Sequence, residues 1–528
     1  MRQALRAAPH LSVVLVAALA GCGGGDNSAP KLTFAERCSQ LAGKAVGGGT
    51  IASTKLVAAA PDKPQTCEAK GTIVSSPTST INFRIDLPED SQWNKKLVQL
   101  GGGGYNGEVR TSDMVTMFSG SEARMRGYAF VGADGGVQTS NLSSTLNNPS
   151  AFDNFAFNYH PQVLKAATAA LQTVYESAPT RKYFWGVSTG GREALLQAQR
   201  YPENYDGIVA GEPVVDYSNV IQKGTAVAQL AFSNGGMGWL NPAKVKLYAD
   251  AQLAACDALD GVADGIISNT GACSFDTQTL RCPAGVDTGD TCLSDEQLAT
   301  INFVRTDTPL PVPVANGITV GPAFGMGAEA DAAAGLTAMQ FGASATQPAS
   351  SLFFFSDFWL KYQVTSDVNT TVLGYTLGSD AARWLELSNK VNATNPDLHA
   401  FADRGGKLLL WAGASDHLVP PAYSSNYYGS VVTKLGQTKT DGFMRFYMLP
   451  GVVHGTTGPG AFMIDYLAAL DSWVENNQAP SDALTVAKPS ADGKTTIRTR
   501  PLCRFPTWPK YGGTGDVNAA SSYSCATL

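Results

Sequence analysis

The stretch YFWGVSTGGREALLQAQR (residues 183–200) decides the fold class. The apolar run 183–185 predicts a buried strand and 192–200 predicts a helix, with the motif G-x-S-x-G (186–190) between them. The glycines of this motif allow a sharp turn that lifts the hydroxyl of Ser188 out of the sheet edge, and the start of the helix supplies backbone N–H groups there. This order predicts a nucleophilic serine, with a plain glycine turn as the alternative.

Strands and helices alternate on both sides of this turn. Apolar residues at helical spacing predict a helix over 161–177, and short apolar runs predict further strands. Such alternation implies a parallel sheet that is covered by helices on both faces. The predicted strands are 96–100, 128–132, 208–210, 407–411 and 444–449.

The alternation is lost over 216–396, a stretch of roughly 180 residues that is long enough for a domain of its own. This stretch contains four cysteines, a dense Asp/Gly segment and an aromatic cluster. We therefore expect an α/β core in two parts, 31–215 and 397–528, interrupted by one inserted lid domain.

The composition is that of a folded, acidic protein. The chain has 528 residues, more than a single domain of about 100–200. Hydrophobic residues make up 44% of it, and 38 Lys and Arg against 44 Asp and Glu give a formal net charge of −6. Because an acidic chain without a basic stripe binds nucleic acid poorly, we expect no nucleic-acid partner.

The first thirty residues have the pattern of an export signal. Two arginines precede an apolar run, 11–20, that is too short for a membrane span of about 20 residues. The sequence Leu-Ala-Gly-Cys ending at Cys22 resembles the bacterial lipoprotein box, so we expect a signal peptide over 1–21, acylation of Cys22 and a flexible tether over 22–30. Gly23 in place of aspartate favours the outer membrane, on its periplasmic side or at the cell surface. An ordinary secretory signal is the alternative.

Export makes the cysteine count informative. Removing Cys22 for lipid leaves eight cysteines, an even number suited to disulfides in an oxidising compartment. Spacing cannot choose among their pairings, so pairing of sequence neighbours is the low-entropy expectation, with some free thiols as the alternative. The expected disulfides are Cys38–Cys67, Cys256–Cys273, Cys282–Cys292 and Cys503–Cys525.

A nucleophilic serine needs a base and a carboxylate that orients the base. After a serine turn of this kind the carboxylate comes next in the chain and the histidine last. Asp416 and His454 each lie just past a predicted strand, at the sheet end where open α/β proteins build their sites. We expect the triad Ser188, Asp416 and His454, with His417 as the rival base.

The oxyanion formed by attack on a carbonyl needs preorganised N–H donors. One expected donor is the backbone of Thr189, which follows the serine. The other is expected in the glycine run 101–104, at Gly103 and Gly104, because missing side chains let the backbone approach the substrate. A flexible loop is the alternative for this run.

Five stretches of the chain resemble the tannase and feruloyl esterase family, which includes the mono(hydroxyethyl) terephthalate hydrolases. The resemblance covers nearly all of the mature chain and implies an α/β-hydrolase core with a lid and a serine esterase mechanism. It also implies esters of aromatic carboxylic acids, such as ferulate, gallate or terephthalate, as substrates. The stretches are INFRIDLPEDSQWNKKLVQLGGGGYNG (81–107), YFWGVSTGGREALLQAQRYPENYDGIVAGEP (183–213), GGKLLLWAGASDHLVP (405–420), FYMLPGVVHGTTGPG (446–460) and RPLCRFPTWPKYGGTGD (500–516).

The chain departs from the family pattern on both sides of the expected site. The family has one cysteine directly before the serine and another directly after the histidine, joined by a disulfide, whereas Val187 and Gly455 stand here. We expect packing around Val187 to replace the bridge and the histidine loop to be looser. A cysteine pair introduced at these positions is then expected to raise thermal stability.

The lid segment CDALDGVADGI (256–266) is rich in aspartate and glycine. Asp-Gly turns can wrap oxygen atoms around calcium, which takes about six to eight of them; a solvated acidic loop is the alternative. The segment resembles the calcium loop in the lid of the family, which implies a structural Ca²⁺. The implied ligands are the carboxylates of Asp257, Asp260 and Asp264 and the backbone carbonyls of Val262 and Ile266.

The lid also contains an aromatic cluster over 353–362. These side chains either stack on a planar aromatic acid or form the core of the lid. No cation among Lys361, Arg383 and Lys390 can be singled out for a substrate carboxylate. We expect a monomer that acts on a small aromatic ester; a hydrolase of other esters such as polyester oligomers, a serine peptidase and a non-catalytic surface lipoprotein that binds ligands are the alternatives.

Overall fold

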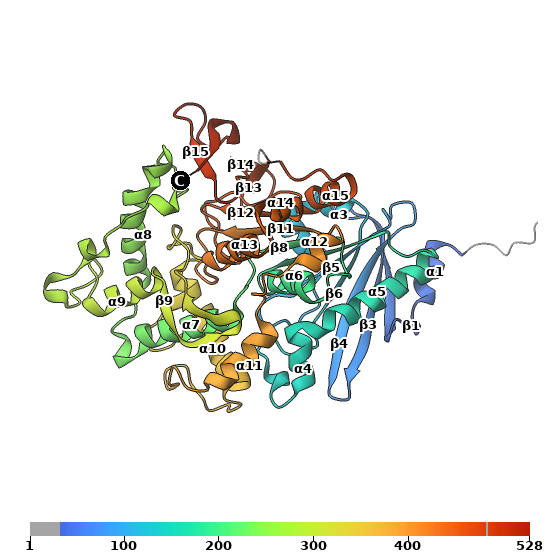
Figure 1. Cartoon of the computed structure of the whole chain (residues 1–528), viewed down its shortest axis with the longest axis horizontal. Coiled ribbons are helices and arrows are strands. Elements are labelled where there is room, and N and C mark those ends of the chain that lie inside the picture. Colours follow the sequence, from blue (N-terminus) through green and yellow to red (C-terminus); the bar gives the residue numbers. More distant parts are fainter. Residues whose placement is uncertain (1–31, 482–483, 528) are drawn as a thin grey trace, which may run out of the picture.

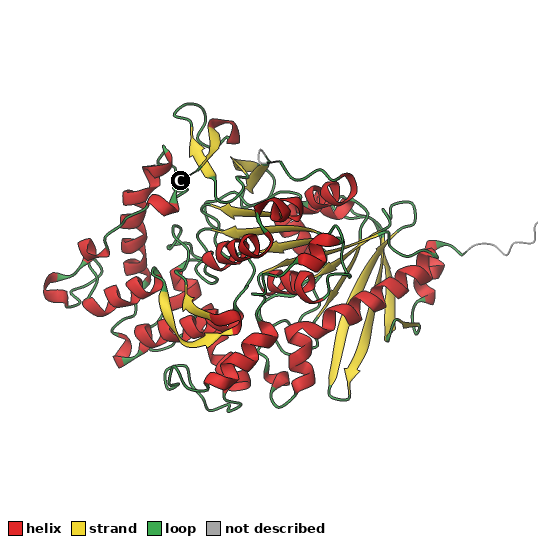
Figure 2. Ribbon diagram, viewed as in Figure 1, coloured by secondary structure: helices red, strands yellow, loops and turns green. Residues whose placement is uncertain are grey.

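The computed structural model describes residues 32–481 and 484–527. The expected signal peptide and the whole of the expected tether, with Cys22, therefore lie outside the described residues. A ten-stranded sheet runs through the molecule in the order β1-β2-β3-β4-β6-β5-β7-β8-β11-β12 (Figures 1 and 2). Its strands are β1 (Ala45–Val46), β2 (Gly49–Val57), β3 (Thr66–Ser76), β4 (Ser79–Pro88), β5 (Lys96–Leu100), β6 (Ala129–Ala133), β7 (Arg181–Val187), β8 (Gly207–Gly211), β11 (Lys407–Gly413) and β12 (Met444–Leu449).

The sheet has a parallel half and an antiparallel half. Strands β6, β5, β7, β8, β11 and β12 pair in parallel, as predicted from the alternation of strands and helices. Strands β1 to β4 form an antiparallel meander that joins β6, and this half was not predicted. The alternating burial along β3 and β4 is the period-two signal that marks it.

Helices cover both faces of the sheet. One face packs against α5 (Tyr159–Tyr175), α6 (Thr189–Arg200) and α13 (Ala422–Leu435), and the other against α2 (Asp113–Ser119) and α15 (Tyr466–Asn476). Both faces of the parallel half are therefore apolar, which explains why its strands read as continuous hydrophobic runs. The remaining helices of the core are α1 (Phe34–Gln40), α3 (Ser121–Met125), α4 (Pro149–Asp153), α12 (His399–Asp403) and α14 (Gln437–Phe443).

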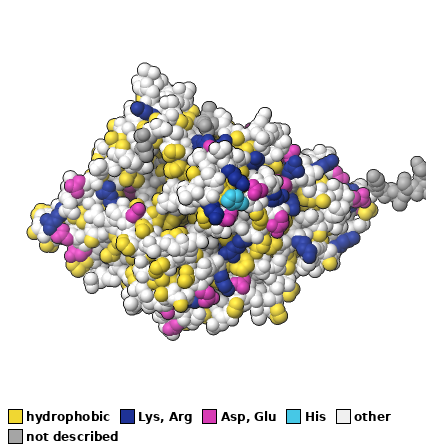
Figure 3. All heavy atoms as spheres, viewed as in Figure 1, with side chains coloured by type: hydrophobic (Ala, Val, Ile, Leu, Met, Phe, Trp, Pro, Cys, Tyr) yellow, Lys and Arg dark blue, Asp and Glu magenta, His cyan; other side chains and the backbone are white. Residues whose placement is uncertain are grey.

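The chain between β8 and β11 leaves the sheet, and we call residues 216–396 the lid region. In Figure 1 it lies at the opposite end of the molecule from β1–β4, and in Figure 3 hydrophobic side chains gather over this side. It contains α7 (Tyr217–Phe232), α8 (Pro242–Cys256), α9 (Asp295–Val304), α10 (Ser351–Trp359), α11 (Ala381–Val391) and the hairpin of β9 (Thr308–Val314) and β10 (Ile318–Gly321). Two hairpins follow the core, β13 (Thr485–Pro489) with β14 (Thr496–Pro501) and β15 (Trp508–Tyr511) with β16 (Tyr523–Ala526).

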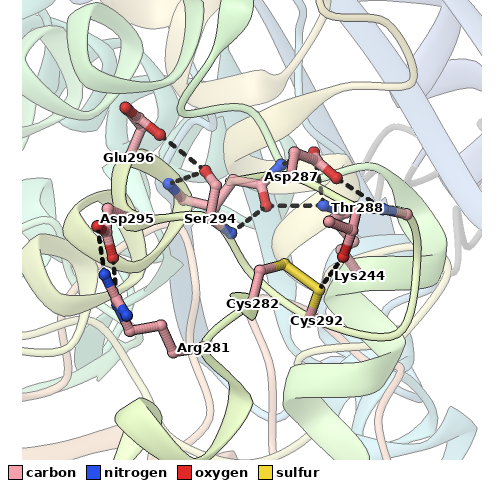
Figure 4. Close-up of a disulfide and its surroundings, with 11 residues drawn as sticks. Lys244, Arg281, Cys282, Asp287, Thr288, Cys292, Ser294, Asp295 and Glu296 are labelled. Atoms are coloured by element: carbon pink, nitrogen blue, oxygen red, sulfur yellow. Dashed lines mark hydrogen bonds and ion pairs between the residues drawn. A yellow bond between two sulfur atoms is a disulfide. The ribbon is translucent and has the colours of Figure 1, made fainter. Parts of the chain in front are cut away.

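Four disulfides join the cysteines in the pairs expected from sequence order: 38–67, 256–273, 282–292 and 503–525. Figure 4 shows the pair Cys282–Cys292, which closes a loop of the lid region beside two ion pairs. Within the described part of the chain, no helix has the length and apolar character needed to cross a membrane.

Candidate active site

Ser188 occupies the predicted sharp turn between β7 and α6. Its φ of 62° lies in the left-handed region, which a residue with a side chain occupies only under strain. A Cβ on Gly186 would come within 2.2 Å of the carbonyl oxygen of Gly190, so the close turn requires glycine there. The turn therefore holds the serine in the geometry of a nucleophile elbow.

Three side chains from distant segments meet at this turn. Nε2 of His454 lies 2.9 Å from Oγ of Ser188, and Nδ1 lies 2.6 Å from Oδ2 of Asp416. Because Oδ1 of Asp416 accepts the N–H groups of Leu418 and Val419, each at 2.8 Å, the carboxylate is held toward the imidazole. With Nδ1–H donating to Asp416, Nε2 is free to accept the serine proton.

The electrostatics of the site favour a protonated His454. Burial opposes protonation, but the charge of Asp416, its hydrogen bond and the charge of Glu212 together raise the histidine pKa to about 9. The rival base His417 is fully buried; burial lowers its pKa to about 4, and Nε2 lies 3.0 Å from the carbonyl oxygen of Gly327. His417 is thus engaged in the lid contact and away from the serine.

A small cavity opens beside Ser188. Thr189 and Gly104, two of the expected oxyanion donors, line it. The N–H of Gly103 instead donates to Oδ1 of Asn106 at 3.2 Å, so the structure favours Gly104 over Gly103 as the second donor.

Glu193 of α6, which sequence reasoning missed, organises this glycine run. Its buried carboxylate accepts the Gly102 N–H at 2.8 Å, the Asn106 amide at 3.0 Å and the Tyr159 hydroxyl at 3.0 Å. Glu193 stands on a helix that is buried on all sides, and a buried charge needs partners inside the protein. A charged residue in such a helix was the signal that could have identified it.

Glu212, directly after β8, was also missed. Its side chain is fully buried, Oε2 accepts the N–H of Gly455 at 2.9 Å, and the same oxygen lies 3.9 Å from Nδ1 of His454. Ligand-type atoms of Glu212, Asp416 and His454 all lie within 4.8 Å of one another, close enough to hold a metal ion. The identity of such an ion does not follow from these atoms.

The lid region contacts both loops that carry the acid and the base. The N–H of Gly325 donates to the carbonyl oxygen of Asp416 at 2.7 Å. The carboxylate of Asp331 accepts the Thr457 hydroxyl at 3.0 Å and the Gly458 N–H at 2.9 Å, in the loop that follows the histidine. The lid thus helps to define the site rather than only covering it.

Aromatic residues of α10 lie at the cavity and beside it. Phe355 lines the cavity with Ser188, while Phe353 and Phe358 line a neighbouring hollow and pack against the core. Both expected roles of the cluster, pocket wall and core, are therefore present. The cations considered for a substrate carboxylate are already paired: Lys361 with Asp357, Arg383 with Glu386 and Lys390 with Asp153.

The acidic loop (256–266) turns its carboxylates onto its own backbone. Asp257 accepts N–H groups seven to nine residues further along, at 2.9 to 3.3 Å. Oδ1 of Asp260 accepts the Val262 N–H at 3.2 Å, whereas its Oδ2 is buried without a hydrogen-bond partner. Burial raises the pKa of both carboxyls. The unpartnered oxygen fits a ligand of a hard cation.

Asp264 in the same loop is already neutralised by the protein. It forms an ion pair with Arg500 and accepts the hydroxyl of Tyr523 at 3.0 Å. Among the described residues, the three loop carboxylates do not bring one oxygen each to within 4.8 Å of one another. The loop therefore offers one free ligand oxygen but not an assembled set of carboxylates.

Comparison with known proteins agrees with the fold. A family model described as tannase and feruloyl esterase matches residues 67–526. An uncharacterized esterase of Agrobacterium fabrum is 35% identical over 91% of this chain and 89% of its own, and a mono(2-hydroxyethyl) terephthalate hydrolase of Piscinibacter sakaiensis is 30% identical over 88% and 85%. The crystal structure of feruloyl esterase B from Aspergillus oryzae superimposes with a TM-score of 0.80 at 25% identity, over 94% of this chain and all of the other. The chain belongs to the tannase and feruloyl esterase family, has an α/β-hydrolase fold and is a carboxylic ester hydrolase.

Proposed function

We propose that the protein hydrolyses esters of aromatic carboxylic acids through an acyl-enzyme on Ser188. The observation that carries the proposal is the continuous set of hydrogen bonds from Ser188 to His454 at 2.9 Å and from His454 to Asp416 at 2.6 Å. In this arrangement the neutral imidazole can take the proton of the serine hydroxyl, which an isolated serine has no partner to accept.

In the acylation step, Ser188 passes its proton to Nε2 of His454 as its oxygen bonds to the ester carbonyl carbon. Asp416 stabilises the imidazolium, and the N–H groups of Thr189 and Gly104 receive the oxyanion. The histidine then gives the proton to the alcohol as the ester C–O bond breaks. A water molecule repeats the sequence on the acyl-serine and releases the acid, with the proton returned to the serine oxygen.

The acid part of the substrate is inferred from relatives and from the cavity. The matching proteins include a mono(2-hydroxyethyl) terephthalate hydrolase and feruloyl esterases. The walls here are largely apolar, with Tyr217, Ile221 and Phe355 near the serine. Such walls suit a planar aromatic acyl group.

The test is a set of initial rates on methyl ferulate, methyl gallate, a terephthalate monoester and 4-nitrophenyl acetate, with 4-nitroanilide counterparts for the peptidase alternative. We expect aromatic esters to be turned over well above the background of Ser188→Ala, and amides not to be. Activity on nitrophenyl acetate alone would remove the aromatic pocket from the proposal. A protein inert toward all of them would support a non-catalytic binding role.

We also propose that the acidic loop binds calcium in a structural role. The buried, unpartnered oxygen of Asp260 and the resemblance of the loop support it. Asp257 and Asp264, turned from their present partners, would complete the ligand set with the carbonyls of Val262 and Ile266. Calcium there would cross-link the loop and take no part in proton transfer.

Calcium content and melting temperature test this role. We expect metal analysis to find calcium in the purified protein, and chelation to lower the melting temperature until calcium is restored. Asp260→Asn should abolish the calcium response, whereas Asp250→Asn, at an exposed ion pair of the same region, should keep it. A melting temperature that is indifferent to calcium would leave Arg500 as the counterion of the loop.

We further propose export and anchoring of the protein through a lipid on Cys22, with the outer membrane as its destination. The lipobox-like sequence and four disulfides, which persist in oxidising compartments, support this. Detergent phase partitioning tests it: full-length protein should enter the detergent phase, and Cys22→Ser should remain in water. Equal partitioning of both would contradict anchoring.

A further inference from the structure

Glu212 lies directly behind the histidine of the triad. Its Oε2 accepts the N–H of Gly455 at 2.9 Å and lies 3.9 Å from Nδ1 of His454. Its Oε1 is buried without a hydrogen-bond partner. Glu212 therefore approaches Nδ1, the ring nitrogen that faces Asp416, whereas Nε2 faces Ser188.

This placement is unfavourable for a glutamate taken by itself. Its φ of 41° lies in the left-handed region, and burial raises the pKa of its carboxyl. The ionisable groups that face it are Asp416 after β11, His454 after β12 and Tyr466 of α15, and the negative charge of Asp416 adds repulsion. A strained residue with a buried, unpartnered oxygen indicates a function that outweighs these costs.

Open space surrounds the position where a side chain of residue 455 would lie. Gly455 has a φ of 112°, and a Cβ built on it would meet nothing within 4 Å. The next anchors, from Asp331 and Lys488, bond one to three residues further along the chain. The bond from Gly455 to Glu212 is therefore the link between the core and the residue that adjoins the base.

We propose that Glu212 is a positioning residue for His454, holding the imidazole between Asp416 and Ser188 through the Gly455 N–H. Its carboxylate also faces Nδ1 and supports the imidazolium that forms when the serine is deprotonated. The inference rests on the proposed function, because it assigns Glu212 to the base of that reaction. It adds a second carboxylate to the three residues of the triad.

The test compares wild type with Glu212→Ala and Glu212→Gln. Two rates are measured: 4-nitrophenyl acetate hydrolysis and covalent labelling of Ser188 by a fluorophosphonate. We expect Glu212→Ala to lower kcat and the labelling rate about 10- to 100-fold with KM changed less than about twofold, because misplacing a base acts on the transition state. Asp86→Ala, which removes a buried carboxylate on β4, is the matched control and should change kcat less than about twofold.

Glu212→Gln separates positioning from charge. Its amide oxygen can accept the Gly455 N–H, so we expect rates within about threefold of wild type. Because the carboxylate raises the pKa of His454, removing it should move the acidic limb of kcat/KM to lower pH and shift the downfield Nδ1–H proton resonance.

The experiment distinguishes failure of the proposed esterase function from failure of the proposed role of Glu212. A wild type that resists the fluorophosphonate and hydrolyses no ester would defeat the proposed function itself. An active wild type whose rates are matched by folded Glu212→Ala would overturn the role of Glu212. If Glu212→Ala does not fold, Glu212→Leu takes its place, because leucine is of similar size and cannot accept the Gly455 N–H; rates that match wild type in this variant would overturn the role.

Discussion

The triad and the acidic loop both depend on buried aspartates, but they are assembled in opposite ways. At the triad, partners 38 and 266 residues apart meet, and each side chain bonds to another side chain. In the acidic loop, Asp257 and Asp260 bond to backbone N–H groups at most nine residues away. The sheet therefore builds the first site, whereas short-range turns hold Asp257 and Asp260 in the second, in which Asp264 alone is tied to the distant Arg500 and Tyr523.

A comparison of the Asp416→Asn and Asp260→Asn variants tests this contrast with the largest expected effect. An amide at residue 416 cannot hold the imidazole in the tautomer that accepts the serine proton, so kcat should fall about 10³- to 10⁴-fold. The same change at Asp260 should alter kcat less than about twofold, because it lies in the lid loop. Initial ester-hydrolysis rates decide; comparable losses in both variants would break the distinction.

The pH dependence of kcat/KM should report the titration of the triad and not that of the acidic loop. Because His454 must be neutral to act as the base and its pKa is raised to about 9, kcat/KM should rise by about tenfold or more between pH 7 and pH 9. The free energy of unfolding should instead fall over this pH range. The pKa of His454 in the folded protein exceeds the usual histidine value of 6.5, so the charged pair stabilises the fold fully below pH 6.5 and loses that contribution as the pH rises through about 9. A rate limb centred at or below pH 6.5 would contradict the geometry of the two carboxylates.

Removing the disulfide beside the acidic loop should affect stability without affecting chemistry. Cys256 and Cys273 are 17 residues apart, and opening such a loop costs about 3 kcal/mol of unfolding free energy. Denaturant unfolding of the double serine variant should show this loss, with kcat within about twofold of wild type. A large loss of kcat in folded protein would mean that the loop supports the triad after all.

The smallest effect is expected from Val187→Cys combined with Gly455→Cys. A bridge here would tie the serine strand to the histidine loop, and we expect the melting temperature to rise. The φ of 112° at Gly455 penalises any side chain by about 1–3 kcal/mol, which offsets much of the gain. Mass spectrometry for the bridge and thermal unfolding give the answer. A formed bridge with a lower melting temperature would show that the bond from Glu212 already positions the loop.

Local patterns predicted the elements that local sequence determines. The serine turn, the strands that end near Asp416 and His454, and a helix expected over 161–177 and found as α5 (Tyr159–Tyr175) follow from periodicity and glycine placement. The antiparallel strands β1–β4 were missed although their alternation is visible.

Contacts that form only when the sheet has folded could not be predicted from the sequence. Glu193 and Glu212 acquire their partners from segments 34 to 243 residues away. Gly104 is favoured over Gly103 as the second oxyanion donor because the amide oxygen of Asn106 accepts the N–H of Gly103. No spacing rule reports such contacts, because they arise from how separate strands and loops pack.

The most direct test of the account is mass spectrometry of the intact protein, quenched within milliseconds of mixing with the 4-nitrophenyl ester of an aromatic acid. The account predicts a mass increase equal to one acyl group, located on Ser188, with a burst of one equivalent of nitrophenolate and neither signal in Ser188→Ala. Turnover that persists in Ser188→Ala, or an adduct on another residue, would contradict it.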